Sequence, residues 1–309
     1  MNKKSLKNKN IYVAGHNGMV GSACVRLLKD KGYLNLIVSS SKDLDLTNQQ
    51  EVKRFFEKEK PEIVINAAAK VGGIWANNEY PYEFLMENML IQNNLIKASF
   101  DNNIKKFIFL GSSCIYPKMA NQPIEESCLL TGELEETNQW YAIAKISGVK
   151  LIEALRREYG KDYIALMPTN LYGPGDNYDL KTSHVLPAMI RKFHEAKQNN
   201  TNVTIWGTGR PLREFLHVDD LAKAVLFCLK NDLEDSLYNV GSGEELTILE
   251  LANLVSKIVG FNGNILWDKT KPDGTPRKLL NSNKLNEKGF KCNIALEEGI
   301  KSTYLKYIL

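Results

Sequence analysis

The sequence predicts an α/β fold with a parallel sheet, and two features of its first half carry that prediction. Short apolar runs occur at 11–14, 34–38, 63–65, 107–110 and 163–167. Between them lie longer segments whose apolar residues recur at helical spacing. Strands that alternate with helices in this way join a parallel sheet through right-handed crossovers, and ligands bind at the carboxyl ends of the strands.

A glycine loop follows the first apolar run. Apolar residues at helical spacing come after it and lead to a stop at Gly32. Glycines spaced in this way let the backbone turn tightly and bring amide groups and a helix N-terminus against a phosphate, although a plain tight turn is the alternative. The strand–loop–helix unit predicts a Rossmann-type, doubly wound sheet that binds a dinucleotide. The loop consists of Gly15, His16, Asn17, Gly18, Met19, Val20 and Gly21.

The end of the second run bears on which dinucleotide binds. Folds of this kind usually carry an acidic residue there when they bind the free ribose of NAD. Residues 39–42 are Ser-Ser-Ser-Lys instead, and Asp43 comes a few residues late. Ser41 and Lys42 leave room for the extra phosphate of NADP, so we expect NADP(H); a polar loop without a cofactor role is the alternative.

The remaining elements follow in order. Thr47 and Gln50 predict a capping box that opens a helix, and Thr247 and Glu250 predict a second one. Other helices are predicted from 81 towards 102, from about 137 to 159 and near 184–197, with strands at 203–206 and ending near 241. We assign 1–172 and 214–241 to a dinucleotide-binding domain, and 173–213 with 242–309 to a smaller, partly interwoven substrate lobe.

The composition excludes several classes of protein. The chain has 309 residues, of which 43% are apolar and 25% charged, as in a globular protein of one large or two smaller domains. The net charge of +4 owes much to Lys3, Lys4, Lys7 and Lys9, which we interpret as a frayed tail rather than a nucleic-acid-binding arm. Neither a signal peptide nor a membrane-spanning run is recognisable, so we expect no membrane partner. Five cysteines without paired spacing predict a reducing cytoplasm, and the absence of a Cys-x-x-Cys or histidine cluster predicts no metal.

Tyr141 and Lys145 stand four residues apart, so both lie on one face of the predicted 137–159 helix. A tyrosine titrates near ~10, but a neighbouring ammonium lowers that pKa. A hydroxyl, such as that of Ser112 after the 107–110 run, can hold a carbonyl against the phenol. Together these groups can protonate an oxygen while a cofactor delivers hydride to its carbon, although such a pair also occurs by chance on many helices.

Together, the glycine loop, Ser112, the Tyr141–Lys145 pair and Arg213-Glu214-Phe215 resemble the extended short-chain dehydrogenase/reductase family, whose members modify nucleotide sugars. The likeness spans nearly the whole chain. It is greatest to members that epimerise and then reduce GDP-4-keto-6-deoxy-mannose with NADPH as homodimers. The runs that carry it are 67–77 (AAAKVGGIWAN), 111–117 (GSSCIYP), 168–174 (PTNLYGP), 213–220 (REFLHVDD) and 271–280 (KPDGTPRKLL).

The resemblance implies a catalytic role for each matching residue. Ser112 is expected to hold the keto oxygen, Tyr141 to donate the proton of the reduction, and Lys145 to support it and bind the nicotinamide ribose. Cys114 and His184 are expected to be the base and acid that epimerise the two carbons beside the ketone, which that ketone acidifies. From the residues alone, a buried core cysteine and a helix-start histidine are the alternatives.

The resemblance also implies two sets of binding residues. The GDP-sugar is expected to contact Lys192, Trp206, Arg213 and Asp273, because cations suit a diphosphate and an aromatic ring stacks on a base. Further cofactor contacts are expected at Ala68, Leu110, Gly111, Ser113, Lys145, Pro168, Thr169, Asn170, Leu171 and His184. Better-known members carry arginines where this chain has Asn17 and Ser41, which leaves Lys42 to hold the phosphate of NADP.

Two alternative functions stay open. One is another nucleotide-sugar epimerase, reductase or dehydratase of the same fold, although a dehydratase would want an acid where Ser113 and Cys114 stand. The other is a cofactor-binding sensor without turnover, which would typically lack Tyr141 or Lys145. The 81–102 and 137–159 helices carry more apolar residues than one sheet face needs, so we expect them to pair with their copies in a homodimer.

Overall fold

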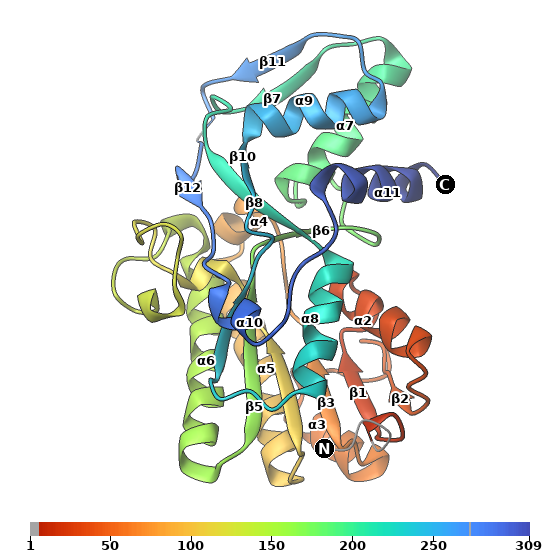
Figure 1. Ribbon diagram of the computed structural model, residues 1–309, viewed down its shortest axis with the longest axis vertical. Helices are drawn as coiled ribbons and strands as arrows, with labels where there is room; N and C mark the ends of the chain where they lie inside the picture. The colour runs from red at the N-terminus through yellow and green to blue at the C-terminus, as the bar shows by residue number, and fades with distance from the viewer. Residues whose placement is uncertain (1–5, 272) are drawn as a thin grey trace.

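The computed structural model describes residues 6–271 and 273–309 and contains a large parallel sheet with helices on both faces (Figure 1). The order of strands in this sheet is β2-β1-β3-β4-β5-β9, and every neighbouring pair is parallel. The chain places β2 on one side of β1 and then β3, β4, β5 and β9 on the other side, so the predicted doubly wound fold is confirmed. The strands are β1 (Ile11–Ala14), β2 (Leu36–Ile37), β3 (Ile63–Asn66), β4 (Lys106–Leu110), β5 (Asp162–Pro168) and β9 (Leu237–Val240).

Each face of the sheet has its own hydrophobic core. Ile11 and Val13 belong to one cluster and Tyr12 and Ala14 to the other, because successive side chains of a strand point to opposite faces. Both faces are covered, so these strands appear in the sequence as apolar runs without alternation. The helices α2 (Met19–Asp30) and α8 (Val218–Lys230) pack on the first face; α3 (Gln49–Glu59), α5 (Pro81–Asp101) and α6 (Gln139–Tyr159) pack on the second.

A smaller lobe lies beyond the carboxyl ends of the large sheet and has a third core (Figure 1). One of its sheets has the order β10-β8-β12, with β6 added on β8, and another pairs β11 with β7. Its elements are β6 (Asn170–Tyr172), α7 (Val185–Asn199), β7 (Val203–Trp206), β8 (Leu212–His217), β10 (Glu245–Thr247), α9 (Ile248–Val259), β11 (Ile265–Asp268), β12 (Arg277–Lys278) and α11 (Leu296–Ile308). The domain division stays a prediction; α10 (Asn283–Glu287) packs against β9 of the large sheet.

The first predicted capping box is wrong. Asn48, not Thr47, caps α3, since its side chain accepts hydrogen bonds from the backbone N–H groups of Gln50 and Glu51. Thr47 instead donates its N–H and hydroxyl to Asp45. Asparagine is at least as good an N-cap as threonine, so the helix begins one residue later than predicted, with Asn48 as its cap. The second box is confirmed: Thr247 and Glu250 cap α9 reciprocally.

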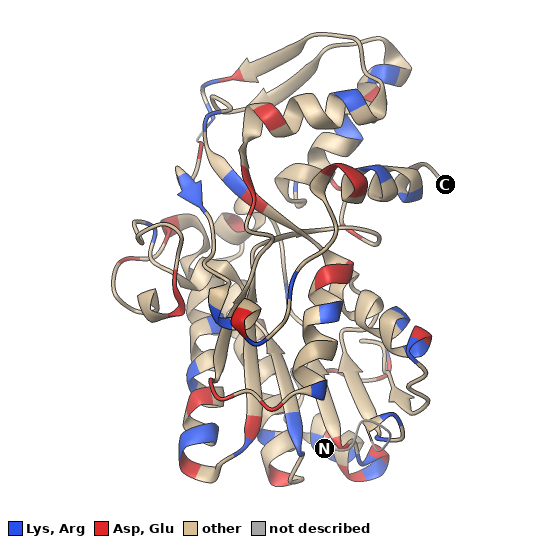
Figure 2. Ribbon diagram, in the orientation of Figure 1, with Lys and Arg blue, Asp and Glu red and all other residues tan. Residues whose placement is uncertain are grey.

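The predicted frayed tail is also corrected where the structure describes it. Leu6 is 2% exposed and packs in the first core, and the ammonium of Lys9 lies 2.6 Å from a carboxylate oxygen of Glu62. Lys3 and Lys4 lie outside the described residues. Figure 2 shows acidic and basic residues interspersed over the helices of both parts of the molecule. Within the described ranges, no helix has both the length and the apolarity to cross a membrane.

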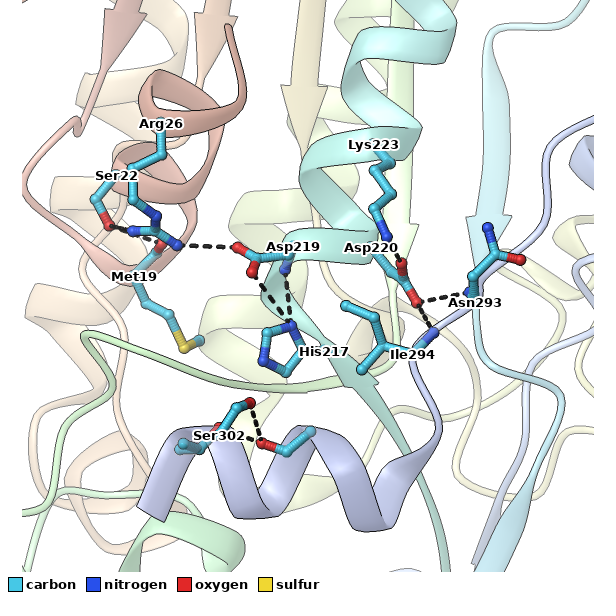
Figure 3. A network of polar contacts seen from close by, with 12 residues as sticks. Met19, Ser22, Arg26, His217, Asp219, Asp220, Lys223, Asn293, Ile294 and Ser302 are labelled. Carbon is cyan, nitrogen blue, oxygen red and sulfur yellow. Dashed lines mark hydrogen bonds and ion pairs between the residues drawn. The ribbon is translucent and has the colours of Figure 1, made fainter. Parts of the chain in front are cut away.

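The first turn of α8 joins three segments that are distant in sequence (Figure 3). Asp219 forms an ion pair with Arg26 of α2, at 2.9 Å. The fully buried carboxylate of Asp220 accepts hydrogen bonds from the backbone N–H groups of Asn293 and Ile294, at 2.9 and 2.8 Å, and pairs with Lys223. Asp220 therefore connects the large sheet to the segment that leads into α11.

Replacement of Asp220 by alanine tests this connection. We expect Asp220→Ala to lower the free energy of unfolding by about 2–4 kcal/mol, because two backbone N–H groups and the Lys223 ammonium lose their buried acceptor. Asp219→Ala is the matched control, since its ion pair is exposed and worth less than about 1 kcal/mol. Urea denaturation measures both variants; equal losses would contradict the special role of Asp220.

Candidate active site

Lys145 ties α6 to the end of β4. Its ammonium donates to the carbonyl of Leu110 at 3.0 Å and lies 4.9 Å from the centre of the Phe109 ring. The helix approaches the sheet closely at Gly148, where a Cβ atom would lie 2.5 Å from that same ring. Tyr141 lies one turn before Lys145 on α6, so the two residues share a face of the helix, as their spacing predicted.

Burial sets the protonation states of this pair. It lowers the pKa of Lys145 to about 8 and raises the pKa of the Tyr141 phenol above its ordinary value. We expected the ammonium to lower the pKa of the phenol, and this is wrong for the cofactor-free protein. The ammonium lies 5.6 Å from the centre of the Tyr141 ring and donates to Leu110, so desolvation outweighs it.

Ser112 and Cys114 follow β4 in a short 3₁₀ turn, η1 (Ser113–Ile115). The hydroxyl of Ser112 caps the turn by accepting a hydrogen bond from the N–H of Cys114 at 3.3 Å. Burial raises the pKa of the Cys114 thiol, while the charge of Lys278, the hydroxyl of Ser112 and the charge of Lys145 act in the opposite direction. The thiol thus has both cationic neighbours and a hydrogen-bonding hydroxyl.

Lys278 is the residue that the sequence analysis missed. It lines a crevice of about 20 Å³ together with Cys114, Glu135 and Asn138, which is room for about one water molecule. His184 is partly open to solvent, yet desolvation by the surrounding protein lowers the pKa of its imidazole, and the charge of Lys278 lowers it further. Cys114 and His184, predicted to act together, therefore share one charged neighbour. The pairing of β12 with β8, which sets Lys278 opposite Arg213, was not recognisable from so short a strand.

The glycine loop fits a dinucleotide phosphate. A Cβ atom at Gly21 would lie 2.1 Å from the carbonyl oxygen of Gly15, and Gly15 itself has a φ of +77° and would meet the backbone of Ala68. Gly18 precedes α2 and offers no side chain to its first N–H groups. Those groups are the donors that a pyrophosphate takes at a helix N-terminus.

The other expected cofactor contacts lie where ligands bind this fold. Ala68 follows β3. Leu110 ends β4, and Gly111 and Ser113 come after it. Pro168 ends β5, and Thr169, Asn170 and Leu171 come after it. Ser41 and Lys42 are exposed just after β2, and the hydroxyl of Ser40 donates to Asp43 at 2.5 Å. His16, Asn17, Met19 and Val20 lie in the loop and at the start of α2.

The four residues expected to bind a nucleotide sugar lie in the smaller lobe as two pairs. Trp206 is half exposed, and the ammonium of Lys192 lies 6.0 Å from its ring centre. Arg213 donates to the backbone carbonyl of Asp273 at 3.4 Å, and the carboxylate of Asp273 accepts from the N–H and hydroxyl of Thr208. Asp273 therefore also orders the loop after β7. Pro272, beside it, lies outside the described residues.

Comparison with known proteins agrees with this geometry. The model of the NAD dependent epimerase/dehydratase family matches residues 11–241. The chain belongs to this family. Over the described ranges, the structure contains no cluster of three or more histidine, cysteine or acidic side chains able to hold a metal ion.

Relatives within the family are similar over almost their full length. The chain is 56% identical to the putative GDP-L-fucose synthase 2 of Arabidopsis thaliana, covering 98% of this chain and 92% of that protein. It is 49% identical to the GDP-L-fucose synthase of Escherichia coli K12, covering 97% and 96%. A GDP-D-glycero-L-gluco-heptose synthase from Campylobacter jejuni, solved in the presence of NADPH, is 37% identical, with a TM-score of 0.91 and coverage of 98% and 99%.

The buried ammonium of Lys145 makes the stability of the cofactor-free protein depend on pH. Its folded pKa of about 8 lies below the ordinary value of ~10.4, so the unfolded chain binds more protons between these values. Below about pH 8 the folded protein bears the full free-energy cost of burying the charged ammonium, and above about pH 10.4 this cost disappears. Lys145→Met removes it, so we expect the difference in unfolding free energy, variant minus wild type, to be more positive at about pH 7 than at about pH 10.5.

Chemical denaturation of both proteins at the two pH values measures this difference. The packing change and the lost hydrogen bond to Leu110 affect both pH values alike, so they cancel in the comparison. An equal difference at the two pH values would show that Lys145 titrates normally.

Proposed function

We propose that this enzyme converts GDP-4-keto-6-deoxy-mannose to GDP-L-fucose, by epimerising the carbons on both sides of the ketone and then reducing the ketone with NADPH. One observation carries the proposal: Cys114, whose N–H is capped by Ser112, interacts by charge with Tyr141 and Lys145 and shares its neighbour Lys278 with His184, so two sets of candidate proton-transfer groups meet there. Tyr141 and Lys145 form one set; Cys114 and His184, with Lys278 as their common neighbour, form the other. Relatives at 49–56% identity that carry this name support it.

The reduction uses the first set. NADPH, when bound, supplies the hydride. The phenol of Tyr141 is protonated near neutral pH, because burial raises its pKa, so it starts as a proton donor to the ketone oxygen. Ser112 orients that oxygen by hydrogen bonding. Lys145, held by its hydrogen bond to the carbonyl of Leu110, would bind the nicotinamide ribose and stabilise the phenolate that forms.

The epimerisation uses the second set. Burial raises the pKa of Cys114 and lowers that of His184, so both groups are neutral in the free enzyme near pH 7. They become base and acid once a proton passes from the thiol to the imidazole, as in other cysteine–histidine pairs. The charge of Lys278 favours the thiolate. The ketone acidifies the neighbouring carbons, so a positioned base and acid are sufficient.

The two ends of the site give the ligands their orientation. Lys192 and Arg213 are cations that suit the diphosphate of a GDP-sugar, and Trp206 offers a ring for stacking. Lys42 is the cation available to the extra phosphate of NADPH. All five cysteines are free, which fits the reducing cytoplasm in which we place the enzyme.

We also propose a homodimer built on α5 and α6. These helices pack against each other and still expose large apolar side chains. A two-fold axis would bury both copies of that surface. Light scattering at micromolar concentration distinguishes a dimer from a monomer. The exposed residues are Tyr82, Met86 and Leu90 on α5, and Trp140, Ile143 and Leu151 on α6.

The precursor of a GDP-linked heptose is the alternative substrate, and the likeness to the heptose synthase favours it. A non-catalytic sensor is disfavoured by the intact Tyr141–Lys145 pair. Mass spectrometry and NMR of the products formed from each candidate substrate with NADPH distinguish these functions. Absence of fucose product from the 6-deoxy sugar would overturn the proposal.

Substitutions separate the two chemistries. Cys114→Ser keeps the size but replaces a thiol of pKa about 8.5 with a far weaker acid, so we expect solvent deuterium to stop entering the sugar ring. Tyr141→Phe should do the reverse: it keeps the exchange of deuterium and loses about 10²–10⁴-fold in NADPH oxidation. NMR of the sugar in D₂O follows the exchange. Wild-type exchange in Cys114→Ser would show that the base lies elsewhere.

The cofactor preference is a separate test. With no acid at 39–42, we expect a higher kcat/KM with NADPH than with NADH, by a smaller margin than two arginines would confer. Ser41→Arg should widen the margin by adding a phosphate contact, and Lys42→Ala should narrow it. Steady-state kinetics with both cofactors measure the ratio. A clear preference for NADH in the wild type contradicts the assignment.

A further inference from the structure

The segment 70–77 runs from the end of β3 to the smaller lobe, and its first part is fixed to α5. The side chain of Asn88, which is buried, accepts from the backbone N–H of Lys70 and donates to its carbonyl, both at 3.0 Å. The ammonium of Lys70 also pairs with Glu83 and Glu87. The segment therefore starts from a rigid position on the large sheet.

The second part of the segment contacts the residues just before His184. The N–H of Gly73 donates to the carbonyl of Thr182 at 2.8 Å. A Cβ atom at Gly73 would lie 2.6 Å from the carbonyl oxygen of Ser183, which is closer than real atoms approach. The backbone of the large sheet's segment thus packs directly on the chain that enters α7, with no side chain between them.

Asn77 fixes the conformation of this contact. Its buried amide group donates to the carbonyls of Gly72 and Gly73, at 2.7 and 3.1 Å. Asn77 lies on α4 (Ile74–Glu79), which also packs against η3 (Glu136–Asn138). Asn138 of η3 lines the crevice that contains Cys114. The same short helix therefore contacts the surroundings of both proposed epimerisation groups.

We infer that Gly73 and Asn77 are positioning residues that set the imidazole of His184 relative to Cys114. The backbone of Gly73, with φ −68° and ψ −177°, is extended and open to any residue. Glycine is needed there because of the contact with Ser183, not because of the backbone conformation. The inference rests on the proposed function of His184 as the acid of the epimerisation.

Gly73→Ala tests the inference, with Gly132→Ala as the control. The added methyl group must displace the backbone at 182–183, whereas at Gly132, which is exposed, it meets only the side chain of Pro117 at 3.3 Å. We expect deuterium exchange into the sugar to fall at least about tenfold in Gly73→Ala, by analogy with misplaced catalytic groups. The product should shift towards the unepimerised 6-deoxyhexose, whereas Gly132→Ala should keep the wild-type product ratio. A wild-type product ratio would overturn the inference.

Asn77→Ala extends the test if Gly73→Ala fails to fold, since it removes two hydrogen bonds and adds no atoms. The same shift in product ratio is expected, to a smaller degree. An equal fall in exchange and in reduction would indicate a general structural defect and overturn the inference.

An NMR titration of His184 separates this inference from the proposed function. Displacement of 182–184 changes the distance between the imidazole and the charge of Lys278, so the pKa of His184 should shift in Gly73→Ala but not in Gly132→Ala. This readout needs no substrate. A wild type that leaves the keto-sugar unchanged would overturn the proposed function alone, whereas an unchanged pKa of His184 in Gly73→Ala would overturn the positioning role.

Discussion

The hydrogen bond from Lys145 to the carbonyl of Leu110 is the constraint on which the rest of the site depends. It fixes α6 to the end of β4 from within the core, and so holds the helix that carries Tyr141 against the strand that leads to Ser112. An ammonium is costly to bury, and the lowered pKa of Lys145 expresses that cost. In the proposed reaction, this cation stabilises the charge that develops on the Tyr141 phenol.

In the smaller lobe, a buried carboxylate likewise holds neighbouring segments together. Glu214 is fully buried and accepts hydrogen bonds from the backbone N–H groups of Gly243 and Leu280, at 2.8 and 3.0 Å. It thereby fixes the segment after β9 and the segment after β12 to β8. Arg213 and Lys278 lie opposite each other on those paired strands, so Glu214 also helps to fix the positions of these two cations of the proposed site.

Much of this arrangement could be predicted from local patterns. The apolar runs, the glycine loop and the Tyr141–Lys145 spacing each report on contacts within a few residues, and the doubly wound sheet follows from them. Lys278 was missed because β12 has two residues and pairs with a strand about sixty positions earlier. The direction of the Tyr141 pKa was wrong because spacing shows a charged neighbour, whereas the depth of burial, which decides the shift, appears only once the chain is folded. The roles of the site residues remain predictions that the variants above address.

The path of the chain between its two parts has a consequence for how such enzymes diversify. The strands of the smaller lobe are contributed by β6, β7, β8, β10, β11 and β12, and the large sheet takes β9 from the middle of that series. Neither part corresponds to one continuous stretch of the gene. A single crossover between two related genes just before β6 would transfer all strands of the smaller lobe, but it would carry α8 and β9 with them. Exchange of the lobe therefore also replaces one edge strand of the large sheet.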